Sequence, residues 1–111
     1  MQRVSEFELP FRQGDSGVKY LMRGPRLDWG VIVLKPGERL AGHYHNEVEE
    51  TFYFLRGRAC LVVNGKELKA IPGDVYRLEP EERHEIRNDS ADEVKLVFIK
   101  APFLPEDKVD I

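Results

Sequence analysis

The sequence predicts an all-β protein built from short strands in one sandwich or barrel. Turn residues recur at short intervals, and the segments between them are rich in β-branched and aromatic side chains. No apolar repeat of 3.6 residues is long enough to favour a helix. A chain of 111 residues is long enough for one core and too short for two. We therefore expect a single domain over residues 1–111.

Seven segments have the composition of strands. In chain order they are residues 29–35, 51–55, 58–63, 66–71, 75–78, 84–88 and 94–100. Pro36-Gly37 closes the first segment and Gly57 closes the second. Asn64-Gly65 lies between the third and fourth, and this dipeptide between two apolar runs is a strong hairpin signal because both residues tolerate positive φ. The polar segment 12–17 and the segment 105–111 predict a loop and a charged tail.

Composition excludes several classes of protein. The formal net charge is −3, and no basic stripe stands out, so we expect no nucleic-acid partner. No segment approaches the ~20 apolar residues of a membrane span, and Glu6 and Glu8 argue against a signal peptide. A cytoplasmic location without membrane association follows by default. Cys60 is the single cysteine, which predicts no intramolecular disulfide and favours a buried, inert thiol.

The three histidines of the chain all fall where a metal site would need them. His43 and His45 are two residues apart, so on a strand they share one face. Glu50 begins an apolar strand and shares a face with two phenylalanines, whereas Glu49 must point away. His84 follows a later turn. Three imidazoles and one carboxylate can hold a divalent transition metal if the two segments meet.

A single histidine in a strand is more often a hydrogen-bonded residue than a metal ligand. The joint arrangement favours the metal interpretation, because the chain has no other histidine and the carboxylate lies on an apolar strand. We interpret Asn88 as a hydrogen-bonding turn residue. Arg77, Arg83 and Arg87 could contact an anionic ligand, although each is more often a solvated surface charge.

Two segments resemble the motifs of the cupin superfamily. Residues 37–57, GERLAGHYHNEVEETFYFLRG, are similar to the first motif, and the spacing to Gly57 selects Glu50 over Glu49. Residues 73–88, GDVYRLEPEERHEIRN, are similar to the second. Glu79 stands where that motif has proline and Glu81 where it has glycine, which predicts a slightly different turn before His84.

The resemblance implies a single cupin domain, a double-stranded β-helix or jelly-roll barrel with a metal inside. The barrel would span about residues 18–103, with an N-terminal strand or arm and a short C-terminal tail. Its metal-binding positions carry over as His43, His45, Glu50 and His84. Iron, manganese, nickel, copper and zinc are all chemically reasonable at such a site.

The reaction stays open at this level. One hypothesis is an enzyme with dioxygenase-like or isomerase-like chemistry on a small oxygen-rich metabolite, with its catalytic residues unassigned. A second is a non-catalytic cupin that binds or senses a small ligand, and a third is a structural barrel with an incidental metal. Residues 94–100 are apolar on both faces, so we also expect a homodimer.

Overall fold

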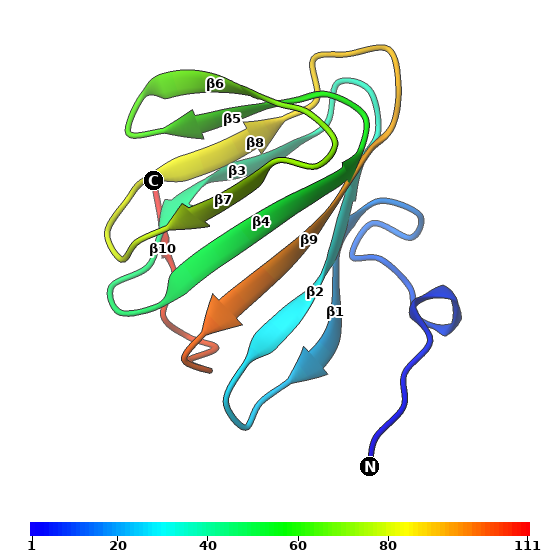
Figure 1. The fold of residues 1–111 in the computed structure, drawn as a ribbon, viewed down its shortest axis with the longest axis vertical. Helices are drawn as coiled ribbons and strands as arrows, with labels where there is room; N and C mark the ends of the chain where they lie inside the picture. The colour runs from blue at the N-terminus through cyan, green and yellow to red at the C-terminus, as the bar shows by residue number, and fades with distance from the viewer.

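The computed structural model describes residues 1–111 and consists of two antiparallel five-stranded sheets packed face to face (Figure 1). One sheet has the order β1 (Gly17–Arg23), β2 (Asp28–Leu34), β9 (Val94–Ala101), β4 (Glu49–Arg56) and β7 (Val75–Leu78). The other has the order β10 (Val109–Asp110), β3 (Arg39–Tyr44), β8 (His84–Arg87), β5 (Ala59–Val63) and β6 (Lys66–Ala70). From β2 to β5 and from β6 to β9, each successive strand lies in the opposite sheet. This winding confirms the predicted all-β jelly roll.

All seven predicted segments form strands, and three further strands lie outside them. β1 follows the polar loop and pairs with β2. β3 carries His43 and pairs with β8. β10 lies within the segment expected to be a charged tail, and it pairs with β3 through Val109 and Asp110. This expectation was therefore wrong for the end of the chain, since a two-residue edge strand depends on its partner and has no periodic signal of its own.

The core lies between the two sheets, where alternate residues of each strand point inward. Phe52 and Phe54 on β4 are completely buried, and Leu61 and Ile86 face them from the other sheet. The twelve buried core residues are Ile32, Leu34, Phe52, Phe54, Ala59, Leu61, Ala70, Leu78, Ile86, Val94, Leu96 and Phe98. Alternation in the sequence thus correctly predicts the buried face of β4, whereas residues 31–34 of β2 are buried on both faces.

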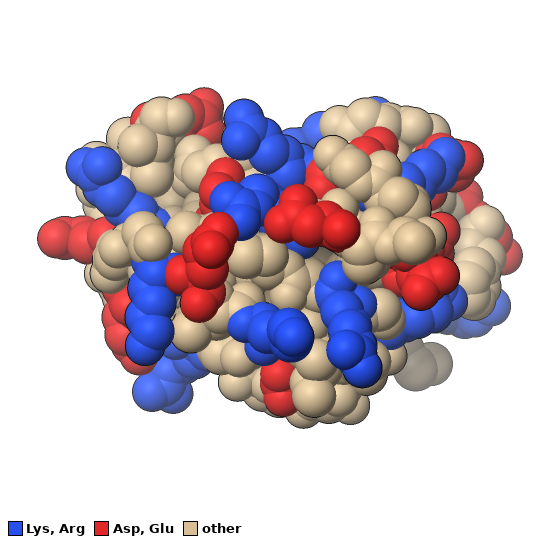
Figure 2. All heavy atoms as spheres, turned by 90° about the horizontal axis from the view of Figure 1, so that it is seen from above, with Lys and Arg blue, Asp and Glu red and all other residues tan.

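The surface carries charges of both signs. Figure 2 shows lysine and arginine interspersed with aspartate and glutamate over one end of the molecule. No helix in the structure has the length and apolar character needed to cross a membrane. Cys60 is half-buried rather than fully buried, and its Sγ lies 3.4 Å from the Arg87 guanidinium. Burial raises the pKa of this thiol, which favours the protonated, unreactive form.

Asn88 joins the two sheets at the end of β8. It is fully buried, and its Nδ2 donates hydrogen bonds to the backbone oxygens of Leu34 and Asp92, both at 2.8 Å. Its Oδ1 accepts hydrogen bonds from the backbone N–H and the hydroxyl of Ser90. The side chain therefore ties β2 to the loop before β9, which agrees with the hydrogen-bonding role predicted for it.

We predict that Asn88→Ala lowers the free energy of unfolding by about 3 kcal/mol, because it leaves buried carbonyl groups without donors. Chemical denaturation monitored by fluorescence would measure the change. Asp89→Ala is the control at an exposed neighbouring position, and we expect a change of less than about 0.5 kcal/mol there. Equal losses in the two variants would contradict the role assigned to Asn88.

Candidate metal centre

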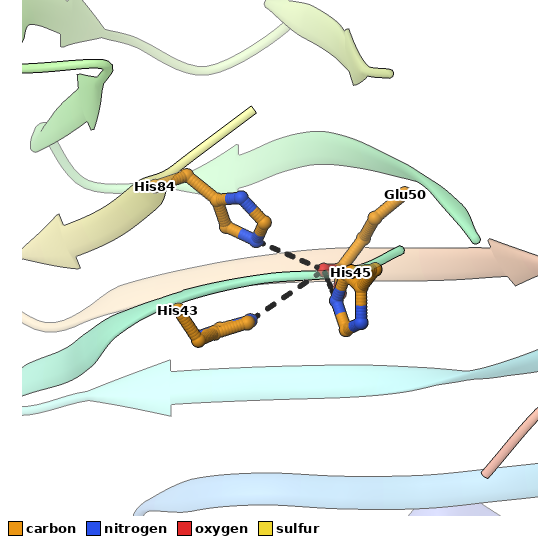
Figure 3. Close-up of side chains that lie close together, drawn as sticks. All are labelled: His43, His45, Glu50 and His84. Atoms are coloured by element: carbon orange, nitrogen blue, oxygen red, sulfur yellow. Dashed lines mark hydrogen bonds and ion pairs between the residues drawn. The ribbon is translucent and has the colours of Figure 1, made fainter. Parts of the chain in front are cut away.

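Four buried side chains from both sheets meet at one point inside the barrel (Figure 3). His43 on β3 lies directly opposite His84 at the start of β8, and His45 follows the end of β3. Glu50 reaches the same point from β4 in the other sheet. Each of the four is at most 4% exposed. The fold therefore brings together the four residues that the sequence singles out.

The three imidazole rings face one carboxylate oxygen of the fourth residue, Glu50. Glu50 Oε1 lies 3.1 Å from His45 Nε2, 3.2 Å from His84 Nε2 and 3.9 Å from His43 Nε2. One donor atom from each residue lies within 4.8 Å of the others. The set consists of three imidazole nitrogens and one carboxylate, which suits a divalent transition metal.

Each histidine is oriented by a backbone carbonyl group. Nδ1 of His43 donates to Ala41 O at 2.9 Å, Nδ1 of His84 donates to Glu82 O at 2.9 Å, and Nδ1 of His45 donates to Asp107 O at 2.5 Å. A neutral imidazole with its proton on Nδ1 has a bare lone pair on Nε2.

With all three rings neutral, the Nε2 lone pairs would face a carboxylate oxygen that can only accept. Such a buried set needs added protons or a metal cation to be stable, and metal-binding histidines in proteins are held in this way. The donor set is thus compatible with a metal ion.

The environment favours the ionised form of Glu50. Burial alone would raise the pKa of this carboxyl group, because charge is costly in an apolar interior. The contacts with His43, His45 and His84 and the nearby Lys100 ammonium oppose burial more strongly, so the pKa of Glu50 lies well below its usual value. A negative ligand is therefore present at neutral pH.

The turn before His84 has one non-glycine residue in the left-handed backbone region. Glu81, at the position of the motif glycine, has a φ of 73°, in the left-handed region that glycine adopts most easily. Its N–H donates to His45 O at 2.6 Å, which links the turn to the loop that carries another of the four residues. The slightly different turn that the two departures predict stays a prediction, and His84 lies in the cluster.

Asp107 is a supporting residue that the sequence analysis missed. Its carboxylate accepts hydrogen bonds from the backbone N–H groups of Asn46, Glu47 and Val48 at 2.8 to 2.9 Å. Its own carbonyl oxygen holds His45. Asp107 therefore fixes the whole loop between His45 and Glu50. The sequence shows only that Asp107 lies in a charged segment. Its contact with Asn46 spans about sixty residues of chain, so no local pattern predicts it.

The remaining charged candidates lie outside the cluster. Glu49 is 45% exposed and lies 3.7 Å from Arg77, so it points away from the site as alternation predicts. Arg77 also pairs with Glu79, and Arg87 pairs with Glu67. Arg83 lies over the ring of Tyr44. The three arginines considered as ligand contacts are thus engaged in pairs of their own.

We predict that Asp107→Ala destabilises the protein by about 2 kcal/mol at pH 7, because three backbone donors lose a charged acceptor. Burial raises the pKa of Asp107, but the three N–H groups lower it more, so the folded pKa lies below the usual value. The stabilisation is therefore present above the ordinary aspartate pKa and is lost as pH falls through the folded one.

Denaturation of the wild-type protein and of Asp107→Ala at a series of pH values measures this effect. The difference between them should be constant above about pH 5 and shrink at lower pH. Asp110→Ala, an exposed carboxylate in the same segment, is the control and should show little change. A difference that does not vary with pH would contradict the assignment.

Comparisons with known proteins agree with this architecture. A family model described as "Cupin domain" matches residues 30–100. The polyketide synthase protein CurC of Streptomyces cyaneus is 30% identical over 77 residues, which are 69% of this chain and 50% of that protein. The quercetin 2,3-dioxygenase of Bacillus subtilis is 36% identical over 70 residues, 63% of this chain and 20% of that enzyme. The chain thus spans half or less of the length of these relatives.

Solved structures show the same fold at low sequence identity. A conserved protein from Klebsiella pneumoniae with a double-stranded β-helix domain has a TM-score of 0.85 and 19% identity, with 99% of this chain and 96% of that one covered. A sugar phosphate isomerase of the cupin superfamily from Silicibacter pomeroyi has a TM-score of 0.63 and 22% identity, with 69% and 51% covered. The family match extends over well over half of the residues. The chain therefore belongs to the cupin domain family.

Proposed function

We propose that this protein is a metal-binding cupin that holds a divalent transition metal and binds or transforms a small oxygen-rich metabolite beside it. The ligands are His43, His45, Glu50 and His84. The observation that carries the proposal is the geometry of the cluster, because each Nδ1 is bonded to a carbonyl group and each Nε2 faces the same buried oxygen of Glu50. Iron, manganese, nickel, copper and zinc all accept this donor set.

The protein itself contributes in two ways: it orients the metal-binding side chains, and it excludes water from part of the site. When bound, a divalent metal at this site supplies Lewis-acid chemistry, and a redox-active metal also supplies electron transfer. The carbonyl groups hold the three imidazole rings in place, and the apolar wall around Phe52 keeps the site dry on one side. On the other side, His43 and Glu50 line a small cavity, which leaves room for a ligand next to the metal.

The reaction class divides the proposal into two versions. One relative is named as a quercetin dioxygenase, and one structural neighbour is named as a sugar phosphate isomerase. Assays for both oxygenation and isomerisation are therefore needed. Oxygen uptake with diketones, thiols and phenols, and isomerisation of sugar phosphates, would reveal turnover. Ligand binding to the metal-loaded protein without turnover in either assay would favour the binding or sensing version.

We predict that the metal-free protein takes up about one Zn²⁺ or Mn²⁺ per chain, and that His84→Ala lowers the affinity by more than about 100-fold. Removal of one imidazole leaves three ligands and a buried carboxylate with less compensation. Elemental analysis after dialysis and calorimetric titration would measure both quantities.

Glu49→Ala is a matched control for the metal experiment, since this residue neighbours Glu50 and points to solvent. It should retain full metal content. Less than about 0.2 metal per wild-type chain, or full occupancy in His84→Ala, would contradict the proposed ligand set.

We also propose that the protein is a homodimer joined through the outer face of the β4, β7 and β9 sheet. Tyr53 on β4 lies beside Val75 on β7 and Val97 on β9 in one row across this face. Tyr53 is 42% exposed and Val75 is 61% exposed, and Ile99 adds a further apolar side chain. A second copy of the chain would bury these groups from water.

We predict that light scattering gives twice the chain mass of 12.9 kDa for the wild-type protein and that Val75→Lys shifts the mass toward one chain. A lysine at the centre of an apolar contact would need to be desolvated, which opposes association. Lys66→Met, on the exposed edge strand of the other sheet, is the control and should leave the mass unchanged. A monomeric wild-type protein would overturn the proposed dimer.

A further inference from the structure

Lys100 lies next to the four-residue cluster, although nothing in the sequence motifs includes it. On neighbouring strands β9 and β4, Lys100 is directly paired with Glu50. Phe98, two residues earlier on β9, is buried in the core, so by alternation the side chain of Lys100 also projects inward. Directly opposed side chains on adjacent strands are close neighbours. A lysine thus reaches into the barrel beside the proposed metal ligands.

The positive charge of Lys100 is not neutralised by an ion pair. Its ammonium has one hydrogen-bond partner, the hydroxyl of Tyr20, at 2.9 Å. In this bond Nζ donates and the phenol oxygen accepts, which leaves the O–H of Tyr20 free to donate. Arg23 lies 3.9 Å over the ring of Tyr20, but its guanidinium already forms two hydrogen bonds with Asp28. Lys100 therefore has further N–H groups beyond the one bonded to Tyr20, and the Tyr20 hydroxyl has a hydrogen to donate.

The two donors line a cavity that continues toward solvent. An inner cavity of about 50 Å³ is bordered by Tyr20, Lys100, His43 and Glu50. An outer cavity of about 400 Å³ shares five lining residues with it, which are Arg12, Val18, Ile32, Leu40 and Lys108. The inner part has room for one functional group, since a water takes about 30 Å³ in the liquid. The outer part is large enough for the rest of a small metabolite.

The lining of these cavities is positive, although the whole chain has a net charge of −3. The outer cavity has three cationic side chains, Arg12, Arg39 and Lys108, of which Arg39 lies 3.7 Å from Glu85, and one carboxylate, Glu38. That carboxylate already accepts hydrogen bonds from Ser16 Oγ at 3.0 Å and from the backbone N–H of Lys35 at 2.7 Å. Clefts of one sign concentrate ions of the opposite sign. The path to the cluster thus favours an anion.

We propose that Lys100 and Tyr20 form an anion subsite and that the ligand of this barrel is a small oxygenated carboxylate. The carboxylate group occupies the inner cavity, where the ammonium and the phenol donate to it, and the remainder of the molecule extends into the outer cavity. This assignment rests on the proposed function in one respect, because it places the ligand beside the metal.

The donors favour a carboxylate over a phosphate ester. The Lys100 ammonium and the Tyr20 phenol match the two oxygens of a carboxylate, and the inner cavity admits only a small group. A second ammonium, that of Lys108, lines the inner cavity and the outer one. Sites for phosphate usually combine several backbone N–H groups or arginine forks. The inner cavity contains a single arginine, Arg12, and that residue lies at its junction with the outer cavity. Neutral sugars would offer the remaining N–H groups of Lys100 only uncharged acceptors.

Calorimetric titration of the zinc-loaded protein at low ionic strength tests this proposal. The probes are lactate, lactamide as its neutral counterpart, and inorganic phosphate. We expect lactate to bind at least about 10-fold more tightly than lactamide and more tightly than phosphate. Lys100→Met should weaken lactate binding by at least about 10-fold and change lactamide binding less than about 2-fold. Tyr20→Phe should weaken lactate binding by a smaller factor.

Three controls separate the possible failures. Lys100→Arg retains the charge and should recover part of the affinity, and Lys66→Met should bind lactate as the wild type does. Metal content is measured in every variant, so a wild-type protein without zinc contradicts the proposed metal centre. For the subsite itself, chemical shifts of the metal-free protein titrated with lactate give a second readout in the wild type and in Lys100→Met.

Equal binding of lactate and lactamide, or unchanged lactate affinity in Lys100→Met, would overturn the anion subsite while leaving the metal centre intact. Absence of lactate binding in both the zinc-loaded and the metal-free protein would overturn it as well. Tighter binding of phosphate than of lactate, with the same dependence on Lys100, would overturn the assignment of a carboxylate.

Discussion

The burial of one ionised carboxylate is the constraint on which the rest of this structure depends. Glu50 is 2% exposed and begins a strand whose inward side chains are otherwise aromatic. An isolated charge in such a place would be far too costly to persist. Three imidazoles and a nearby ammonium offset that cost, and the strands that carry these groups must therefore meet at one point. The need to compensate the buried charge of Glu50 therefore links the closure of the barrel to the chemistry of its interior.

Backbone groups around the cluster orient its side chains. Carbonyl oxygens fix the proton positions on all three imidazole rings, and two of these carbonyl groups lie within two residues of the histidine they hold. The third comes from Asp107, whose carboxylate also orders the loop between His45 and Glu50. Precise orientation of the ligands reduces the reorganisation needed when a metal binds. The last segment of the chain thus supports the centre of the molecule.

Charged side chains are distributed differently along the path to the cluster and over the rest of the surface. Lysine, arginine and carboxylate side chains alternate over the exterior, as Figure 2 shows for one end. Along the path toward the cluster, Arg12 and Lys108 are exposed residues at its outer part, and Lys100 lies beside Glu50 in the barrel. For the proposed anion subsite, the charges that line this path matter more than the net charge of the chain.

The sequence by itself determined the fold class, most strands and the four residues of the cluster, because these depend on local regularities. Alternation on a strand separates Glu50 from Glu49, and the spacing of His43 and His45 places both rings on one side. The tertiary structure alone decided the roles of Asp107 and of the Tyr20 and Lys100 pair, which contact residues about sixty to eighty positions away. Such contacts leave no periodic trace in the chain, since they depend on which strands become neighbours after the sheets have formed.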